Sequence, residues 1–327
     1  MPRAAPPALA LGTYVGVLPC ADCEGLRYQL ELRGDQSYVL RHTYLGKGPH
    51  EAGRTVFDDI GRWLLSSDGA VLAIRGAREL PEYFELLPQA LRKLDREGQP
   101  VRSAANHLLR RVRNAARLEP QLPMQGHLHV DAAVFVDCTT GARWHIANEA
   151  DWSAAERAVA KAVEEARPKA AAPLVSIEAT QDGASLVIDR FNMVLEDKTA
   201  CDPPFATLPL RGTLWALVRL GAQSEPLARG SYGAQLHLSA GRSAKVTGYS
   251  GCNRLISSAE VQGSNVRFGA QSASRVACVA GDAARVEAGL LDALAGARRW
   301  RTVGAVLELY GEDDQLLARF EGEATGR

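Results

Sequence analysis

The sequence predicts a mainly β protein made of three β-rich units in tandem. Short runs of alternating apolar and polar residues follow one another, and turn-forming Gly, Asp and Ser residues separate them. Proline-containing stretches at 118–123 and 202–209 have the composition of linkers. Six cysteines fall in chain order into three pairs, one pair for each unit. The expected domain boundaries are therefore 10–117, 124–206 and 210–325.

The size and charge of the chain exclude some classes of function. Its 327 residues suit two to three domains. Lysine plus arginine and aspartate plus glutamate both number 38, so the formal net charge is zero. A balanced charge gives no electrostatic basis for binding nucleic acid, and we expect no nucleic-acid partner. No apolar run has the length of a membrane-spanning helix.

The first unit begins with a Cys-x-x-Cys string that opens an alternating strand. Cys20 and Cys23 precede residues 28–32, in which apolar side chains recur at every second position. Turn residues at 34–35 and 66–69 separate this strand from further short strands. Strands at this spacing predict an all-β barrel or half-barrel.

The spacing of Cys20 and Cys23 suits three kinds of chemistry: a small-loop disulfide, half of a soft-metal site, or a redox dithiol. Two thiolates suit Cu(I), with His42 or His50 as further candidate ligands. In an oxidising compartment the same pair forms a disulfide, which offers no thiolate. A redox Cys-x-x-Cys usually stands at a helix start, whereas this one opens a strand, which disfavours the redox alternative.

The most specific sequence motif in the first unit is the string Gly16-Val17-Leu18-Pro19-Cys20-Ala21-Asp22-Cys23-Glu24-Gly25-Leu26. With residues 91–98, it resembles the amino-terminal domain of NlpE-type envelope lipoproteins. The resemblance implies a lipocalin-like barrel and a non-enzymatic role in copper homeostasis and envelope-stress signalling. It also implies a bacterial periplasmic or outer-membrane location and an envelope-stress sensor protein as partner. A periplasmic thiol redox protein and a carrier of a small apolar ligand are the alternatives.

The start of the chain does not resemble a signal peptide. Leu18 and Pro19 precede Cys20 where a lipoprotein signal would place small residues. We expect the export signal to lie upstream of Met1. The expected membrane attachment is a lipid anchor that this sequence lacks.

The second unit combines short strands with one helix. The sequence predicts strands at 128–135, 143–147, 174–179 and 186–191, with a turn at 137–141. Ser153 and Glu156 have the spacing of a capping box, and Pro168 is expected to end the helix that follows. His127 and His129 place two imidazoles on one face of a strand, a spacing that metals use, although exposed histidines at a domain entry are the simpler interpretation. The segment 131–141 looks like the middle module found beside NlpE-type domains, which implies an OB-like barrel.

The third unit resembles a META domain of the HslJ type, which implies an α+β fold. The residues that carry this resemblance lie in three strings, at 212–215, 248–254 and 274–278. A helix follows them, with Val286, Leu290, Leu291 and Leu294 on one face.

The string Gly251-Cys252-Asn253-Arg254 is interpreted as a structural motif. Gly251 permits a left-handed turn, Asn253 can bond local backbone, and Arg254 can tie two strands together.

The cysteines are expected to form three disulfides. One pair for each unit is compatible with an oxidising compartment. The domain resemblances favour Cys138–Cys201 and Cys252–Cys278, and Cys20–Cys23 is the third pair. Scattered cysteines can also be small buried hydrophobic residues, and composition alone leaves that alternative open.

The sequence contains no recognisable catalytic motif. It has no Gly-x-Ser-x-Gly elbow, phosphate loop, Rossmann fingerprint or His-Glu-x-x-His. Neighbouring strand residues point to opposite faces, so Asp58-Asp59 and Asp313-Asp314 do not make two-acid sites, and both pairs are interpreted as turns. We expect no enzymatic activity and no required cofactor. Copper is the candidate ligand.

Overall fold

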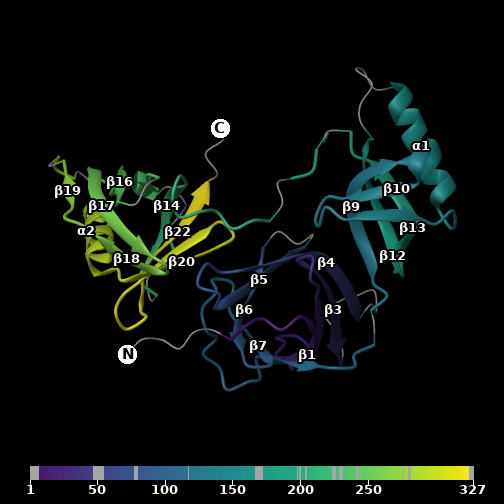
Figure 1. The fold of residues 1–327 in the computed structure, drawn as a ribbon, viewed down its shortest axis with the longest axis horizontal. Helices are drawn as coiled ribbons and strands as arrows, with labels where there is room; N and C mark the ends of the chain where they lie inside the picture. The colour runs from purple at the N-terminus through teal and green to yellow at the C-terminus, as the bar shows by residue number, and fades with distance from the viewer. Residues whose placement is uncertain are drawn as a thin grey trace. The chain divides into compact units, whose positions relative to one another are not determined.

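The protein is described by a computed structural model, whose strands form two closed barrels and a nine-stranded sheet (Figure 1). This mainly β architecture confirms the predicted fold class. None of the described helices is both long and apolar enough to cross a membrane. The described residues are 7–46, 55–76, 80–116, 118–165, 172–196, 198, 200–202, 205–222, 226–227, 231–240, 243–274, 276–278 and 281–323.

By its internal contacts the chain divides into two compact units. The first comprises Met1–Trp63 and Val71–Phe205 and contains both barrels except the last two residues of β4. The second comprises Leu64–Ala70 and Ala206–Arg327.

The first barrel has eight strands in chain order. Each described pairing between neighbours is antiparallel, and β8 pairs with β1 through Thr13 and Val112, which closes the barrel. The strands are β1 Gly12–Leu18, β2 Gly25–Leu32, β3 Ser37–Leu45, β4 Val56–Leu65, β5 Val71–Gly76, β6 Glu82–Leu87, β7 Ala90–Lys93 and β8 Leu108–Val112.

Large apolar side chains fill the core of this barrel. Leu30, Tyr38, Leu72, Phe84 and Leu109 come from five different strands, and each is almost completely buried. Their burial follows from strand alternation, which turns every second side chain inward.

Asp58 and Asp59 lie inside β4, so the predicted turn at this position is wrong. The two carboxylates face opposite sides of the strand and have separate partners. Asp58 pairs with Arg41 on β3 at 2.7 Å, whereas buried Asp59 accepts a hydrogen bond from the Tyr38 hydroxyl at 2.7 Å. These partners stabilise acidic residues within the strand. Asp313 and Asp314 do lie in a turn.

The second barrel has five strands in the order β10-β11-β13-β12-β9. The pairing of β11 with β13 is parallel, and helix α1 lies between the third and fourth strands in the chain. This arrangement is that of an OB-like barrel. Its elements are β9 Gln121–His129, η1 Val130–Ala132, β10 Val134–Asp137, β11 Arg143–Ile146, α1 Trp152–Glu165, β12 Leu174–Asp182 and β13 Ser185–Val194.

The stretch 118–123 is not wholly a linker, because β9 already begins at Gln121. Leu122 and Met124 point into the barrel core, and Pro123 between them is exposed. The alternation of buried and exposed side chains therefore continues through the proline. The core contacts of Leu122 and Met124 outweigh the turn signal that Pro123 provides.

Two local predictions in this barrel are wrong. The strand expected at 128–135 is interrupted by η1, after which Ala133 has a left-handed φ of 49°. Helix α1 begins at Trp152, so Ser153 lies inside the helix instead of capping it. The main-chain oxygen of Asp151 accepts the amides of Ala154 and Ala155, both at 3.1 Å, which replaces the expected capping box. Pro168 lies outside the described residues.

The second compact unit, which contains the predicted META region, has a nine-stranded sheet and one long helix. The strand order is β16-β15-β14-β22-β21-β20-β18-β17-β19, and an additional pairing joins β16 to β17. Its elements are β14 Leu214–Leu220, η2 Ser231–Gly233, β15 Gln235–Leu238, β16 Ser243–Tyr249, β17 Arg254–Gln262, β18 Asn265–Phe268, β19 Ser272–Ala273, α2 Gly281–Gly296, β20 Arg299–Val303, β21 Val306–Tyr310 and β22 Leu316–Glu323.

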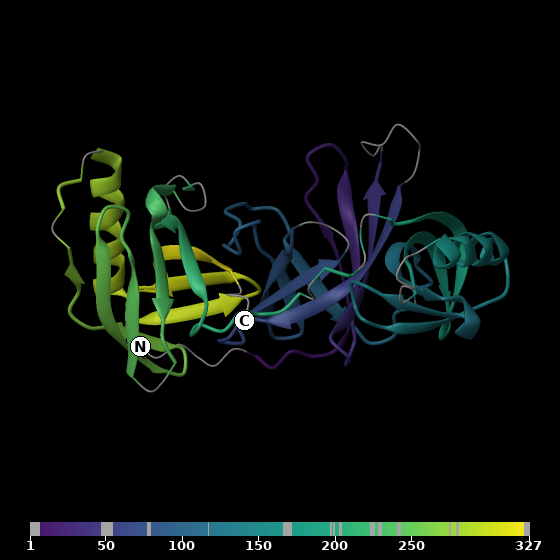
Figure 2. The same cartoon turned by 90° about the horizontal axis from the view of Figure 1, so that it is seen from above.

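Helix α2 packs its apolar side against this sheet, and Figure 2 shows the helix alongside the strands. Leu290 and Leu294 are fully buried and belong to one cluster with Trp215 and Phe320. Leu291 is partly buried against the same cluster. The predicted apolar face of the helix is thus the face that forms the core.

Candidate functional site

The Cys20–Cys23 pair occupies the turn that joins β1 to β2. The two cysteines form a disulfide, with their Cα atoms 5.3 Å apart. Both are half-buried, and Ala21 and Asp22 between them are exposed. The motif is therefore an accessible loop between two strands and does not stand at a helix start.

The structure does not add a third metal ligand to Cys20 and Cys23. His42 lies on β3, is 2% exposed, and packs its ring edge-on to Tyr28 with centroids 4.2 Å apart. His50 lies outside the described residues. Among the His, Cys, Asp and Glu side chains that are described, none groups with this cysteine pair closely enough to share an ion.

His127 and His129 lie on one face of β9, opposite the buried Leu128. The Nδ1 atom of His127 lies 2.7 Å from the main-chain oxygen of Ala172. Within the described parts of the chain, no third ligating side chain joins the two imidazoles.

The second disulfide joins Cys138 to Cys201, with Cα atoms 5.2 Å apart. Asp137 precedes it and is 1% exposed. Burial raises the pKa of the Asp137 carboxyl, although hydrogen bonds from the hydroxyl and amide of Thr140 and the amide of Thr139 oppose that shift. The carboxyl holds the 137–141 turn together, because the Thr140 amide donates to it at 2.8 Å.

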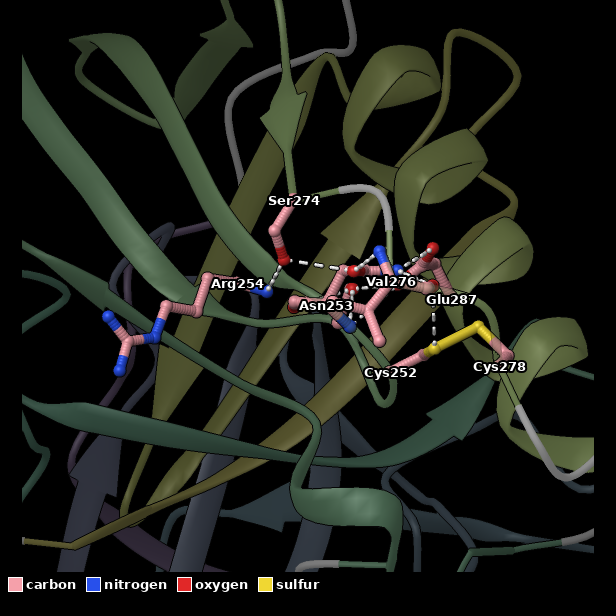
Figure 3. Close-up of a disulfide and its surroundings, with 8 residues drawn as sticks. Cys252, Asn253, Arg254, Ser274, Val276, Cys278 and Glu287 are labelled. Carbon is pink, nitrogen blue, oxygen red and sulfur yellow. Dashed lines mark hydrogen bonds between the residues drawn. A yellow bond between two sulfur atoms is a disulfide. The ribbon is translucent and has the colours of Figure 1, made fainter.

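The third disulfide joins Cys252 to Cys278, with Cα atoms 5.6 Å apart, and Asn253 lies beside it (Figure 3). The Asn253 side-chain amide donates to the main-chain oxygen of Val276 at 3.2 Å and to Glu287 at 3.0 Å. Its oxygen accepts the Ser274 hydroxyl and the Val276 amide, both at 2.9 Å. One buried side chain thus connects the start of β17, the 274–278 loop and helix α2.

Glu287 on α2 completes this arrangement. Its carboxylate accepts the Asn253 main-chain amide at 2.9 Å and the Ser250 hydroxyl. Gly251, which follows Ser250 in the chain, has a φ of +106°, and a Cβ there would lie 3.1 Å from the Val286 side chain. We call Ser250, Asn253, Ser274, Val276 and Glu287 the Asn253 cluster.

The side chain of Arg254 does not take part in the Asn253 cluster. Only its main-chain amide does, donating to the Ser274 hydroxyl at 3.1 Å. Figure 3 shows the guanidinium pointing away from the disulfide, and it has no bonding partner among the residues that the structure describes. The contact that Arg254 contributes to this motif is therefore made by its main-chain amide.

Cys252, Cys278 and Glu287 place their ligand atoms within 4.8 Å of one another. Because both sulfurs are joined in a disulfide, they offer no thiolate to a metal ion. Glu287 is also occupied by its hydrogen bonds to the Asn253 cluster. The group is consequently organised as a covalent and hydrogen-bonded junction.

The role of Glu287 was not predicted from the sequence, because this residue lies among apolar helix residues and belongs to no motif. The buried Glu308 also belongs to no motif, and two of its partners, Arg301 and Arg319, lie on the neighbouring strands β20 and β22. Glu308 is 2% exposed and binds Arg301, Arg319 and the Tyr310 hydroxyl. A charged residue between apolar neighbours, as in Leu307-Glu308-Leu309, was the signal available in the sequence.

Comparison with known proteins identifies two regions of the chain. Residues 14–104 match the family profile of the NlpE N-terminal domain, and residues 208–324 match that of the META domain. The chain is 34% identical over 140 residues to Lipoprotein NlpE of Escherichia coli (strain K12), a match that covers 42% of this chain and 57% of that protein. The matched region thus spans little more than half the length of this relative.

Among solved structures, the chain is similar to one described as that of the Cpx pathway activator NlpE from Escherichia coli. The identity is 26%, the match covers 58% of this chain and 97% of that chain, and the TM-score is 0.26.

Proposed function

We propose that this chain is a bacterial cell-envelope protein that takes part in envelope-stress signalling and catalyses no reaction. The observation that carries the proposal is the similarity to Lipoprotein NlpE, 34% identical over 140 residues, together with the NlpE N-terminal domain at 14–104. The NlpE of Escherichia coli is described as an activator of the Cpx pathway. By this similarity, the proposed partner of the present chain is an envelope-stress sensor protein.

The proposed location is the periplasm or the outer membrane, with attachment through a lipid anchor. All six cysteines are joined in disulfides in the structure. Disulfides persist in oxidising compartments such as the bacterial periplasm. The covalent organisation of the chain therefore supports an envelope location.

The proposed domain organisation is three modules at 10–117, 124–206 and 210–325. Support comes from the three separate sheets and from the fact that each disulfide joins residues of one module. Within the third module, the proposed role of Gly251, Cys252 and Asn253 is structural, because they join β17, a loop and α2.

A reporter assay tests the signalling proposal. The whole chain is exported behind a lipoprotein signal in Escherichia coli that lacks its own NlpE, and a Cpx-responsive promoter is measured. The expected result is induction by the anchored protein, with no induction by the same chain lacking the signal. Absence of induction, at envelope levels that match those of Escherichia coli NlpE in a parallel strain, would refute the proposal.

The finer proposal is that the reduced protein binds Cu(I) weakly through Cys20 and Cys23. The exposed position of the loop between β1 and β2 supports access for an ion and a reductant. Two thiolates suit a soft ion of low coordination number, whereas zinc favours four ligands. Retention of Cu(I) by the Cys20→Ser, Cys23→Ser variant at wild-type affinity, measured by competition titration, would refute this role. The Cys252→Ser, Cys278→Ser variant is the matched control.

A further inference from the structure

A groove of about 480 Å³ lies on the outer face of the sheet formed by β14, β15, β16 and β17. Its volume falls within the range of sites for small molecules. We call it the META groove, and the lining residues that matter here are Gln235, His237, Thr247, Tyr249 and Arg254.

Strand register places these five side chains on one face of the sheet. Gln235 lies opposite Tyr249, which lies opposite Arg254, and His237 lies opposite Thr247. Side chains directly opposite each other on neighbouring strands lie close together. The intervening residues, including Leu236, Val246 and Leu255, point the other way into the core. The polar side chains of the META groove therefore form two adjacent rows that face away from the core.

The hydrogen-bonding groups of these two rows are unused by the fold. Among the described residues, none of the five side chains has a hydrogen-bond or ion-pair partner. This contrasts with the neighbouring Asn253, whose amide makes four hydrogen bonds. The polar side chains of the META groove are therefore available to a ligand, whereas those of the Asn253 cluster are occupied.

The charge of the groove favours an anion. Its described lining contains Arg254 and no carboxylate. A guanidinium presents parallel N–H donors that match the two oxygens of a carboxylate or phosphate. Gln235, Thr247 and His237 offer further hydrogen-bonding groups along the adjacent rows.

Tyr249 provides a flat apolar surface beside these polar groups. Gly233 borders its ring, and a Cβ at that position would lie 3.3 Å from the Tyr249 Cδ1 atom. Gly233 also has a φ of +65°, which favours glycine. The glycine therefore keeps space open at the edge of the tyrosine ring.

We propose that the META groove binds a small organic oxyanion, with Arg254 pairing the charged group and Tyr249 contacting the body of the ligand. The charged group is a carboxylate or a phosphate, since the guanidinium recognises either. This site is separate from the Cys20–Cys23 loop and goes beyond the signalling proposal.

Isothermal titration of the whole protein tests the inference. The probes are N-acetylglutamate, glycerol 3-phosphate and inorganic phosphate, with the uncharged diamide N-acetylglutaminamide as the comparison. The expected result is saturable binding of at least one oxyanion in preference to the neutral amide. Arg254→Ala should weaken that binding by about tenfold or more, because a charge-assisted hydrogen bond is lost. The exposed Arg267→Ala on β18 is the matched control and should bind as wild type does.

Arg254→Lys separates charge from geometry, because it keeps the cation and loses the paired donors. Circular dichroism establishes that each variant is folded. The relative affinity of the carboxylate and phosphate probes identifies the source of the oxyanion. The inference is overturned if no oxyanion saturates the protein at millimolar concentration, if the neutral amide binds equally well, or if Arg254→Ala binds as wild type does.

Discussion

Glu308 is the centre of a buried group of charges in the nine-stranded sheet. Its carboxylate accepts hydrogen bonds from Arg301 at 2.9 Å, from Arg319 at 3.1 Å and from the Tyr310 hydroxyl at 2.7 Å. Burial by itself lowers the pKa of Arg301, but the nearby charges of Glu308, Tyr310 and Asp68 and the hydrogen bond to Glu308 together outweigh it and hold that pKa above its usual value. The group is stable only while the anion and its cations are present together.

Replacing Glu308 with glutamine should destabilise the protein by about 3–5 kcal/mol, the usual effect of removing one partner of a buried ion pair. Two arginines would then remain buried without their counter-ion. Denaturant unfolding monitored by tryptophan fluorescence measures the change. Glu260→Gln, at an exposed position of β17, is the control and should leave the unfolding free energy nearly unchanged.

Asp137 should make stability depend on pH. Because burial raises its pKa in the folded state, its favourable contribution is complete below the ordinary aspartate pKa and is lost as the pH rises through the folded value. Asp137→Asn removes this titration. The stability of wild type relative to this variant should therefore fall as the pH increases from acid towards neutral. If exposed Asp131→Asn produced the same pH profile, the effect would not belong to Asp137.

At the scale of secondary structure, side-chain hydrogen bonds of the Asn253 cluster connect the start of β17, the loop that holds Ser274 and Val276, and helix α2. The 274–278 loop depends on Asn253 for contacts at Ser274 and Val276. The Cys252–Cys278 disulfide provides the covalent part of the same connection.

Asn253→Ala should loosen this loop and destabilise the protein by about 1–3 kcal/mol for each buried partner left unsatisfied. Hydrogen exchange should become faster at Val276 and at the start of β17. Asn192→Ala is a suitable control, because Asn192 is exposed on β13 and makes one 3.4 Å side-chain contact. Unchanged exchange at Val276 would show that the disulfide alone holds the loop.

The sequence predicts a helix or strand correctly where buried and exposed side chains follow a regular period. The strand from Gly25 to Leu32 and the apolar face of α2 follow directly from periodicity. The errors occur where tertiary contacts override local signals. Pro123 lies within a strand because Leu122 and Met124 on either side of it are buried in the barrel core. Helix α1 begins at the buried Trp152, one residue before the expected cap Ser153.

The candidate sites were predictable only in part for the same reason. Cysteine spacing identifies the Cys20–Cys23 loop directly. The side-chain partners of Asn253 come from distant parts of the chain, and Arg301 and Arg319 reach Glu308 from neighbouring strands, so no local pattern shows them. The META groove brings together residues of neighbouring strands, and alternation shows which side chains share a face of one strand but not which strands lie side by side.

At the scale of the whole molecule, the disulfides are predicted to lie within modules and never between them. Peptide mapping of the non-reduced protein should recover Cys20–Cys23, Cys138–Cys201 and Cys252–Cys278. Each bridge restricts the unfolded chain locally, so each should stabilise its own module. A bridge joining cysteines of two modules would contradict the proposed division at 10–117, 124–206 and 210–325.

The central claim is that the chain takes part in envelope-stress signalling, and because the similarity to NlpE carries that claim, we expect the first compact unit to suffice for it. The most direct measurement compares Cpx reporter output from the anchored whole chain with that from an anchored chain ending at residue 205, after the first compact unit. The account predicts that the shorter protein still induces the reporter and that a chain lacking residues 7–116 does not. Induction that persists without residues 7–116, or that is lost from a stable, exported protein ending at 205, would contradict it.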